Sequence, residues 1–391
     1  MPSSAFVMIY FDNNATTSLD PDVLEAMLPF LRENYGNPSS AYSFGKRAAQ
    51  AVHHAREQLA DLLGCEPSEL IFTSCGTESD NSAIQSAIQL DPDRRHLVTS
   101  KVEHSAIVNH AETLARRGYE VTWLSVNPDG LIDLRELENA IRPDTAIVSL
   151  IWANNETGVL FPIEEAAAIC RAKGTLFHTD AVQAVGKIPI DLRKSSIQFL
   201  SLSGHKLHAP KGVGALYVNR RTRFNPYLIG GGQESKKRGG TENTASIVGL
   251  GVAAELAGVH LSEENAEVRA LRDAFEEGIL NRIPNVQVNG HRTLRLPNTS
   301  NLAIEGIDSE GMLMLLDQKG ICCSAGSACT AGSLEPSHVL RAMGCSTDRA
   351  RGSLRFSFSR LNTPDEVRQA LEIIPRLVQK LRSMSSGVLA A

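Results

Sequence analysis

Two residues far apart in the sequence, Lys206 and Cys329, have side chains suited to covalent chemistry. Cys329 lies in residues 322–332, which are all Gly, Ala, Ser or Cys apart from Thr330. This stretch has no large apolar side chain to anchor it in a core, so we expect a mobile surface loop. Lys206 follows a short apolar run and is expected to hold a cofactor at a strand end. Taken alone, a lysine is more often a solvated surface residue and a cysteine a buried structural one.

Three further motifs carry groups that an aromatic cofactor with a phosphate needs. Residues 72–81 read as a strand, a glycine turn and a helix start, where backbone N–H groups and the Thr77 hydroxyl would bind a phosphate. Asp180 ends a buried strand, and a cationic ring nitrogen would satisfy its carboxylate. His104 could stack on a ring or transfer a proton. Each motif alone also fits an N-cap, a capping aspartate or a structural histidine. Together with Lys206 they predict a pyridoxal phosphate site.

Composition indicates an ordinary globular protein. A length of 391 residues exceeds one core and suggests two domains, and the chain is 42% apolar and 21% charged. The net charge of -5, without a long basic segment, argues against a nucleic-acid partner. No membrane span or secretory signal is expected, because no run of about 18 apolar residues occurs and no basic segment precedes an apolar one near the start. We therefore expect a cytoplasmic protein whose seven cysteines are free thiols.

The chain alternates helical and strand patterns in its first part and is mixed in its second. Short apolar runs between amphipathic stretches are typical of a mostly parallel sheet covered by helices. We expect an α/β fold with a large domain at residues 17–258 and a smaller α+β domain made of residues 1–16 and 259–391. Helices are expected at residues 21–33, 46–63, 79–88, 105–117, 163–173, 244–256, 262–280, 310–319, 335–343 and 364–384. Strands are expected at residues 70–72, 97–99, 146–151, 176–178, 199–202, 215–218, 302–304 and 353–359.

Seven short motifs occur in order over nearly the whole chain: Phe11–Thr17, Gly36–Ser40, Ala153–Gly158, His178–Gln183, Ser203–Lys206, Arg238–Asn243 and Gly326–Gly332. In this combination they resemble the class I cysteine desulfurases, the NifS/IscS group of the class-V aminotransferase superfamily. The sequence, down to the stretch Ser333–Val339, looks closest to the nitrogen-fixation NifS branch. Ala325 stands where relatives often carry Ser, and Cys322 and Cys323 stand where small residues are common.

The resemblance implies a homodimeric fold-type I pyridoxal-phosphate enzyme with a seven-stranded sheet in its large domain. It implies that Lys206 holds the cofactor covalently, that Asp180 pairs with the pyridine nitrogen and that His104 stacks on the ring. The other implied cofactor contacts are Gly76, Thr77, Ser203 and His205 at the phosphate, Gln183 at the ring hydroxyl, Gly204 and Asn155 nearby, and Thr241 from the partner subunit. Asn155 and Arg355 are implied to bind the substrate carboxylate, which a guanidinium can do through two hydrogen bonds. Taken alone, Arg355 also fits a surface ion pair.

The implied reaction removes sulfur from L-cysteine. Lys206 takes the α-proton, and the Cys329 thiolate attacks the substrate sulfur to give L-alanine and a persulfide on Cys329. His104 is a further catalytic candidate because it could help to deprotonate the thiol. The sulfur would pass to an iron–sulfur scaffold protein, where Cys329 could transiently ligate a cluster. No other metal site and no membrane partner are expected.

Several alternatives remain open beside the desulfurase. A selenocysteine lyase or an aminotransferase of the same fold would use the same lysine and phosphate site, although an aminotransferase has no use for Cys329. A non-enzymatic iron–sulfur scaffold would use Cys322, Cys323 and Cys329, whose spacing lacks the C-x-x-C regularity of such sites. The sulfur could serve nitrogenase, general iron–sulfur assembly or tRNA thiolation.

Overall fold

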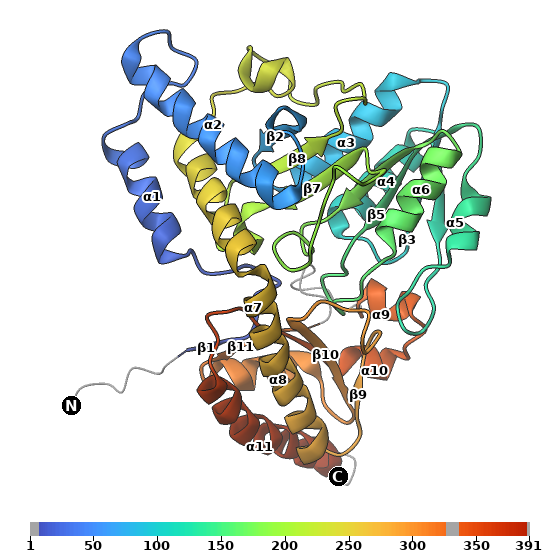
Figure 1. The fold of residues 1–391 in the computed structure, drawn as a ribbon. Coiled ribbons are helices and arrows are strands. Elements are labelled where there is room, and N and C mark those ends of the chain that lie inside the picture. Colours follow the sequence, from blue (N-terminus) through green and yellow to red (C-terminus); the bar gives the residue numbers. More distant parts are fainter. Residues whose placement is uncertain (1–7, 326–335, 389–391) are drawn as a thin grey trace.

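The computed structural model describes residues 8–325 and 336–388 (Figure 1). Its α-helices are α1 (Pro21–Arg32), α2 (Ser43–Leu63), α3 (Gly76–Leu90), α4 (Ser105–Arg116), α5 (Leu134–Ala140), α6 (Ile163–Ala172), α7 (Thr244–Arg282), α8 (Ser309–Asp317), α9 (His338–Ala342), α10 (Thr347–Arg351) and α11 (Pro364–Val388). Its strands are β1 (Ile9–Tyr10), β2 (Leu70–Thr73), β3 (His96–Ser100), β4 (Glu120–Leu124), β5 (Thr145–Ile151), β6 (Leu176–Asp180), β7 (Phe199–Ser203), β8 (Gly214–Val218), β9 (Val286–Val288), β10 (Thr299–Ile304), β11 (Ile321–Cys322), β12 (Ser324–Ala325) and β13 (Ser353–Ser357). Short 3-10 helices are η1 (Pro67–Glu69), η2 (Gly204–Lys206) and η3 (Gln233–Lys236).

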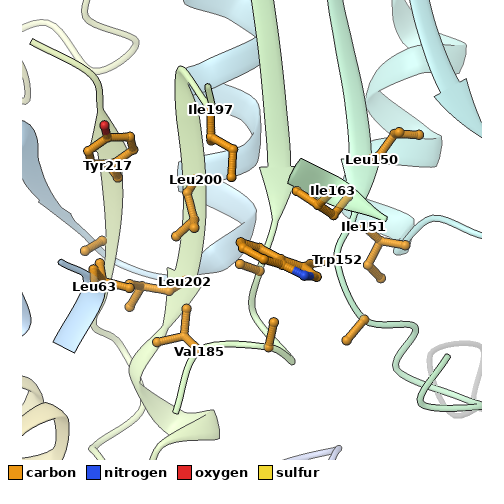
Figure 2. Packing of buried hydrophobic residues seen from close by; sticks show 14 of the residues in the cluster. Leu63, Leu150, Ile151, Trp152, Ile163, Val185, Ile197, Leu200, Leu202 and Tyr217 are labelled. Carbon is orange, nitrogen blue, oxygen red and sulfur yellow. The ribbon is translucent and has the colours of Figure 1, made fainter. Parts of the chain in front are cut away.

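Within the described residues, the larger sheet has seven strands in the order β2-β8-β7-β6-β5-β3-β4. Strands β4, β3, β5, β6 and β7 run parallel, and β8 runs antiparallel to both of its neighbours. Helices α3 and α4 supply one apolar cluster on this sheet, and α2, α6 and the first half of α7 supply another. Figure 2 shows Leu200 and Trp152 among the side chains of the second cluster. The predicted α/β fold with a mostly parallel seven-stranded sheet is confirmed.

A smaller α+β part lies below the larger sheet in Figure 1. Within the described residues it has an antiparallel sheet in the order β12-β13-β10-β9, and β1 pairs with β11 in parallel. Helices α8 and α11 and the second half of α7 pack around an aromatic core. In that core the Phe275 ring lies 4.7 Å from Phe356 and 5.7 Å from Phe11, measured between centroids. Ile9 and Phe11 therefore pack on this part.

Helix α7 is continuous over 39 residues, so the prediction of two helices at 244–256 and 262–280 is wrong. Gly258 lies inside it without ending it, since a helical glycine costs only about 1 kcal/mol. The segment Thr244–Ser262 is long and apolar enough to cross a membrane, but Ile247 and Leu250 lie in the large core, as expected of an internal helix. The predicted domain boundary at 258/259 falls within α7, and the division into domains stays a prediction.

Candidate active site

A cavity of about 320 Å³ lies where the parallel strands of the larger sheet end. Ile151, Asp180 and Ser203 are the last residues of β5, β6 and β7, and open α/β sheets bind ligands at this edge. The side chains or backbone that line it are Asn14, Ala15, Cys75, Gly76, Thr77, Asp80, His104, Ile151, Asn155, Asp180, Val182, Gln183, Ser203, His205, Lys206 and Arg355. The structure thus brings together ten of the residues that the sequence singled out: Gly76, Thr77, His104, Asn155, Asp180, Gln183, Ser203, His205, Lys206 and Arg355.

Lys206 is held at the end of the short helix η2, which follows β7 directly. Its Nζ donates hydrogen bonds to the backbone oxygens of Asn14 (2.5 Å) and Ala15 (2.7 Å). Both residues belong to the segment between β1 and α1, which therefore lies against the cavity. The lysine predicted as the cofactor anchor is thus a partly buried side chain of the cavity wall and not a solvated surface residue.

The predicted phosphate site lies between β2 and α3. Helix α3 begins at Gly76, and the side chain of its N-cap residue, Cys75, makes no capping hydrogen bond. A helix N-terminus of this kind attracts anions through its backbone N–H groups and its dipole. The neighbouring His205 is neutral at pH 7, because burial and the charge of Lys206 lower its pKa to about 4. It can therefore donate a hydrogen bond without adding a charge.

Two ion pairs fix this turn from outside. Glu78 in the first turn of α3 accepts hydrogen bonds from Arg238 Nε (2.9 Å) and from the Ser74 backbone N–H (2.8 Å). Glu234 accepts from Arg56 Nη2 at 2.6 Å and from the backbone N–H of β2 at 2.9 Å. Hydrogen bonds between charged, mostly buried groups are stronger than neutral ones. The segment that contains η3 is therefore tied at one point to the first turn of α3 and at another to β2, which precedes the phosphate turn.

Gly76 has no room for a side chain, because an added Cβ would lie 2.6 Å from Val182 Cγ2. Crowding of this kind typically costs about 1–3 kcal/mol. We expect Gly76→Ala to weaken pyridoxal phosphate binding about tenfold or more, measured by absorbance titration of the apoprotein. Gly258→Ala is the matched control, since its Cβ would meet Leu62 at an ordinary 3.7 Å. Equal affinity in both variants would contradict the assignment of this turn.

Two buried carboxyl groups, Asp180 and Asp80, line the cavity and are 3% and 1% exposed. Asp180 accepts a hydrogen bond from the Val182 backbone N–H (2.9 Å), whereas Asp80 Oδ1 has no hydrogen-bond partner within the described residues. Burial raises the pKa of both, and the charge of Asp180 raises that of Asp80 further. Nearby His178 does not compensate them, because burial lowers its pKa to about 3. A cationic ring nitrogen would compensate the charge of these carboxylates, so this wall of the cavity fits the predicted cofactor.

Glu103 is a third buried carboxyl group, next to the predicted stacking residue. Ser100 donates to its Oε1 (2.5 Å), but its Oε2 has no hydrogen-bond partner in the part of the chain that is described. Burial raises its pKa from 4.5 to about 8. The unfolded chain releases this proton near pH 4.5 and the folded chain only near pH 8. The free energy of unfolding therefore falls as the pH rises between these values.

We expect Glu103→Gln to remove this loss of stability. The apoprotein should gain roughly 2–4 kcal/mol at pH 8 and little near pH 4.5. Equilibrium unfolding in urea at both pH values measures the difference. Glu138→Gln, at an exposed position on α5, serves as the control and should change little at either pH. A gain from Glu103→Gln that is equal at both pH values would show that its pKa is not raised.

His104 is the N-cap residue of α4, and its Nδ1 accepts a hydrogen bond from the Ala106 backbone N–H (3.2 Å). A ring nitrogen that accepts carries no proton, so this geometry assigns the proton of the neutral ring to Nε2. A neutral ring with a defined tautomer that lines the cavity suits both stacking and proton transfer. Both roles of His104 stay predictions.

Arg355 lies on β13 and is only 2% exposed, so it is not the surface residue of the alternative interpretation. Its Nη2 donates to Asp12 Oδ1 (2.7 Å) and its Nη1 to the backbone oxygen of Asn155 (2.9 Å). Its buried Nε has no hydrogen-bond partner within residues 8–325 and 336–388. Because Arg355 lines the cavity, its guanidinium fits the predicted carboxylate ligand.

Residues 12–15, part of the Phe11–Thr17 motif, have no role in the predicted site, but in the structure they contact several of its residues. The Asn14 backbone oxygen accepts from Lys206 Nζ and from Gln183 Nε2 (2.9 Å). The Asn14 side chain donates to the Asn155 backbone oxygen (3.2 Å), and Asp12 pairs with Arg355. One feature of the sequence that could have pointed to this segment is the run of polar residues directly after Phe11, at the end of an apolar stretch.

Some predicted site residues do not line the cavity. Gly204 is buried beside it, and its backbone N–H donates to Val213 (2.9 Å). Thr241 is exposed on the segment between η3 and α7. Cys329 lies outside the described residues, so its predicted role stays a prediction. Cys323 packs against the smaller core and burial raises the pKa of its thiol, which indicates a structural residue.

Comparisons with known proteins agree with this geometry. The family model "Aminotransferase class-V" matches residues 9–370. The chain is 55% identical over 378 residues to "Cysteine desulfurase 2" of Trichormus variabilis, which covers 97% of this chain and 95% of that protein. It is 53% identical over 378 residues to "Cysteine desulfurase NifS" of Azotobacter vinelandii, with 96% and 94% covered. Among solved structures, a "NifS-like protein" superposes with a TM-score of 0.90 at 38% identity, covering 95% of this chain and all of that one.

Proposed function

The chain belongs to the class-V aminotransferase family, and within it we propose that the protein is a pyridoxal-phosphate-dependent cysteine desulfurase. Its substrate would be L-cysteine and its products L-alanine and a persulfide on Cys329. The observation that carries the proposal is the cavity that unites Lys206, the buried Asp180 and Arg355 with the phosphate turn at Gly76. Relatives about half identical over nearly the whole chain are named cysteine desulfurases, which supports the same reaction here.

Pyridoxal phosphate, when bound, supplies an electron sink that weakens bonds at the α-carbon of an amino acid. The residues of this chain would divide the remaining work. Asp180 holds the proton on the ring nitrogen, and the turn at Gly76 holds the phosphate. Arg355 orients the substrate through its carboxylate. Lys206 Nζ accepts the proton from the substrate α-carbon, a role that its place in the cavity wall suits.

The sulfur transfer itself is assigned to Cys329. Its thiolate would attack the sulfur of the bound cysteine, so that a sulfur–sulfur bond forms as the carbon–sulfur bond of the substrate breaks. The electron pair of that bond stays on the substrate carbon, which takes up a proton and leaves as alanine. His104, with its proton on Nε2 and its Nδ1 tied to α4, is the proposed partner of the thiol: its Nε2–H would donate a hydrogen bond to the Cys329 sulfur and so stabilise the thiolate.

A homodimer would complete the site, with Thr241 of one subunit at the phosphate of the other. Thr241 is exposed and does not line the cavity of its own chain, although its segment is pinned to the phosphate turn through Arg238 and Glu78. Large apolar side chains are exposed between β8 and η3 and on the stretch from α1 to α2, which supports a protein partner there: Leu31, Tyr35, Tyr42, Tyr227 and Ile229. Sedimentation of the purified protein would measure the dimer, and a monomer with bound cofactor would contradict it.

The persulfide sulfur would pass to an iron–sulfur scaffold protein in the cytoplasm. Names of relatives such as NifS and IscS support a place in iron–sulfur cluster assembly, including that of nitrogenase. Cross-linking of the persulfidated enzyme to its acceptor would identify the partner. Transfer to a tRNA-thiolating protein alone would contradict the assignment to cluster assembly.

Incubation with L-cysteine tests the proposed reaction. We expect alanine and transferable sulfur in equal amounts. Turnover of L-selenocysteine with none of L-cysteine would favour a selenocysteine lyase, and transfer of the amino group to a keto acid would favour an aminotransferase. Visible absorption that a chelator removes would favour the iron–sulfur scaffold. Among the described residues, no cluster of three metal-ligating side chains occurs.

A further inference from the structure

Lys187 is a second amine close to the cofactor cavity, and the proposed reaction gives it no task. It lies seven positions after Asp180, in the turns that follow β6. Its Nζ donates to Gln183 Oε1 at 2.8 Å and to Asn14 Oδ1 at 3.5 Å. Within the described residues no ion pair joins it to a carboxylate. Its acceptors are therefore two amide oxygens, and both belong to residues of the cavity wall.

This placement is costly for a lysine. An ammonium removed from water without a counter-charge loses hydration that two neutral acceptors do not fully replace. Burial, followed by the charges of Lys206 and Arg355, lowers the pKa of Lys187 to about 7. A merely structural side chain at this position would be more stable if it were apolar. The polar contacts of Lys187 therefore point to a role in the site.

The amide of Gln183 shows what that role is. In its ammonium form Lys187 has only donors, so the Gln183 atom that faces it is the carbonyl Oε1, and Nε2 is the donor at the other end. One Nε2 proton goes to the Asn14 backbone oxygen at 2.9 Å. A flipped amide would place its NH2 against the amine of Lys187 and its oxygen against the Asn14 oxygen. Both contacts would then fail, so Lys187 and Asn14 together fix one orientation of Gln183.

We propose that Lys187 is a positioning residue that acts through Gln183, so that the amide presents an N–H donor, and not an oxygen, to the ring oxygen of pyridoxal phosphate. This inference rests on the proposed function, in which that oxygen lies at Gln183. With one Nε2 proton used by Asn14, the second is the amide donor left for a ligand in the cavity. A donor fixed in advance binds an oxygen that carries negative charge more tightly than an amide free to rotate.

Equilibrium binding of pyridoxal phosphate to the apoprotein tests the proposal without any turnover. We expect Lys187→Met to weaken the binding of pyridoxal phosphate about tenfold. This is the effect of losing one hydrogen bond to a charged group. Lys187→Arg, which keeps a donor toward Gln183, should stay within about threefold of the wild type. Lys194→Met is the matched control and should bind normally, because Lys194 is 86% exposed and pairs with Asp191. If Lys187→Met does not fold, Lys187→Ala, which also lacks a donor, takes its place.

A double-mutant cycle separates positioning from a structural role. In a Gln183→Leu background, Lys187→Met should change the affinity for pyridoxal phosphate less than about twofold, because the amide it orients is gone. Any change that Lys187→Met makes to the urea midpoint of unfolding should be the same in the wild-type and Gln183→Leu backgrounds. An equal loss of cofactor affinity in both backgrounds would overturn the proposal and leave the proposed function intact. An apoprotein that binds no pyridoxal phosphate at all would overturn both.

Discussion

Replacement of Cys329 by alanine is expected to abolish the release of sulfur from L-cysteine, with a loss of at least about a thousandfold in kcat. The reason is chemical: without its thiolate the enzyme has no nucleophile for the substrate sulfur, and water attacks such a sulfur poorly. Cofactor binding should not change, because Lys206 and the phosphate turn are intact. Coupled assays for alanine and sulfide measure the loss, and absorbance of the bound cofactor checks the site.

The control for Cys329→Ala is Cys345→Ala. Cys345 is partly exposed near the end of α9, where its sulfur lies 4.0 Å from Asn289 Oδ1, and it does not line the cofactor cavity. Its replacement should leave turnover within about twofold of the wild type. Desulfurase activity that survives Cys329→Ala but is lost in Cys345→Ala would show that the nucleophile is Cys345 and not Cys329.

Lys206→Ala is expected to have the second large effect, on both cofactor and turnover. Nζ would serve as the covalent anchor and as the base at the α-carbon, and a well-placed general base alone contributes about a hundredfold to ten-thousandfold. The visible absorption of covalently held pyridoxal phosphate should disappear, and turnover should fall by at least about a thousandfold. A spectrum identical to that of the wild type would refute Lys206 as the anchor.

Lys211→Ala is the control for this substitution. Lys211 lies only five positions after Lys206, but its side chain is exposed and does not line the cavity. It should keep the spectrum and the turnover of the wild type. Added methylamine can also test the role of the amine: partial rescue of Lys206→Ala without rescue of Cys329→Ala would separate the two steps.

The residues at strand ends were predictable because local pattern places them. Asp180, Ser203 and Lys206 each follow a short apolar run, and the parallel strands β6 and β7 bring their ends to one edge. The glycine turn before α3 was predictable for the same reason. Edge strands were missed: β4 is partly exposed and β9 has three residues, so neither shows the apolar run of a buried strand.

The contacts of Asp12 and Asn14 could not be predicted from a local pattern. Asn14 bonds to Lys206 and to Thr299, and the latter lies 285 positions away. Asp12 pairs with Arg355 from 343 positions away. Such contacts depend on how the smaller part packs against the larger one. Helix α7 links these two parts without a break, although the sequence predicted two helices there. The composition of this segment alone does not reveal that the helix is continuous.

A single turnover tests the proposed reaction most directly. The enzyme with bound pyridoxal phosphate is mixed with one equivalent of L-cysteine, quenched and digested, and the peptides are analysed by mass spectrometry while alanine is quantified. We predict one alanine per site and the mass of one extra sulfur atom on the peptide that contains Cys329. Alanine formed with no added sulfur on that peptide, or extra sulfur on another cysteine, would contradict a persulfide on Cys329.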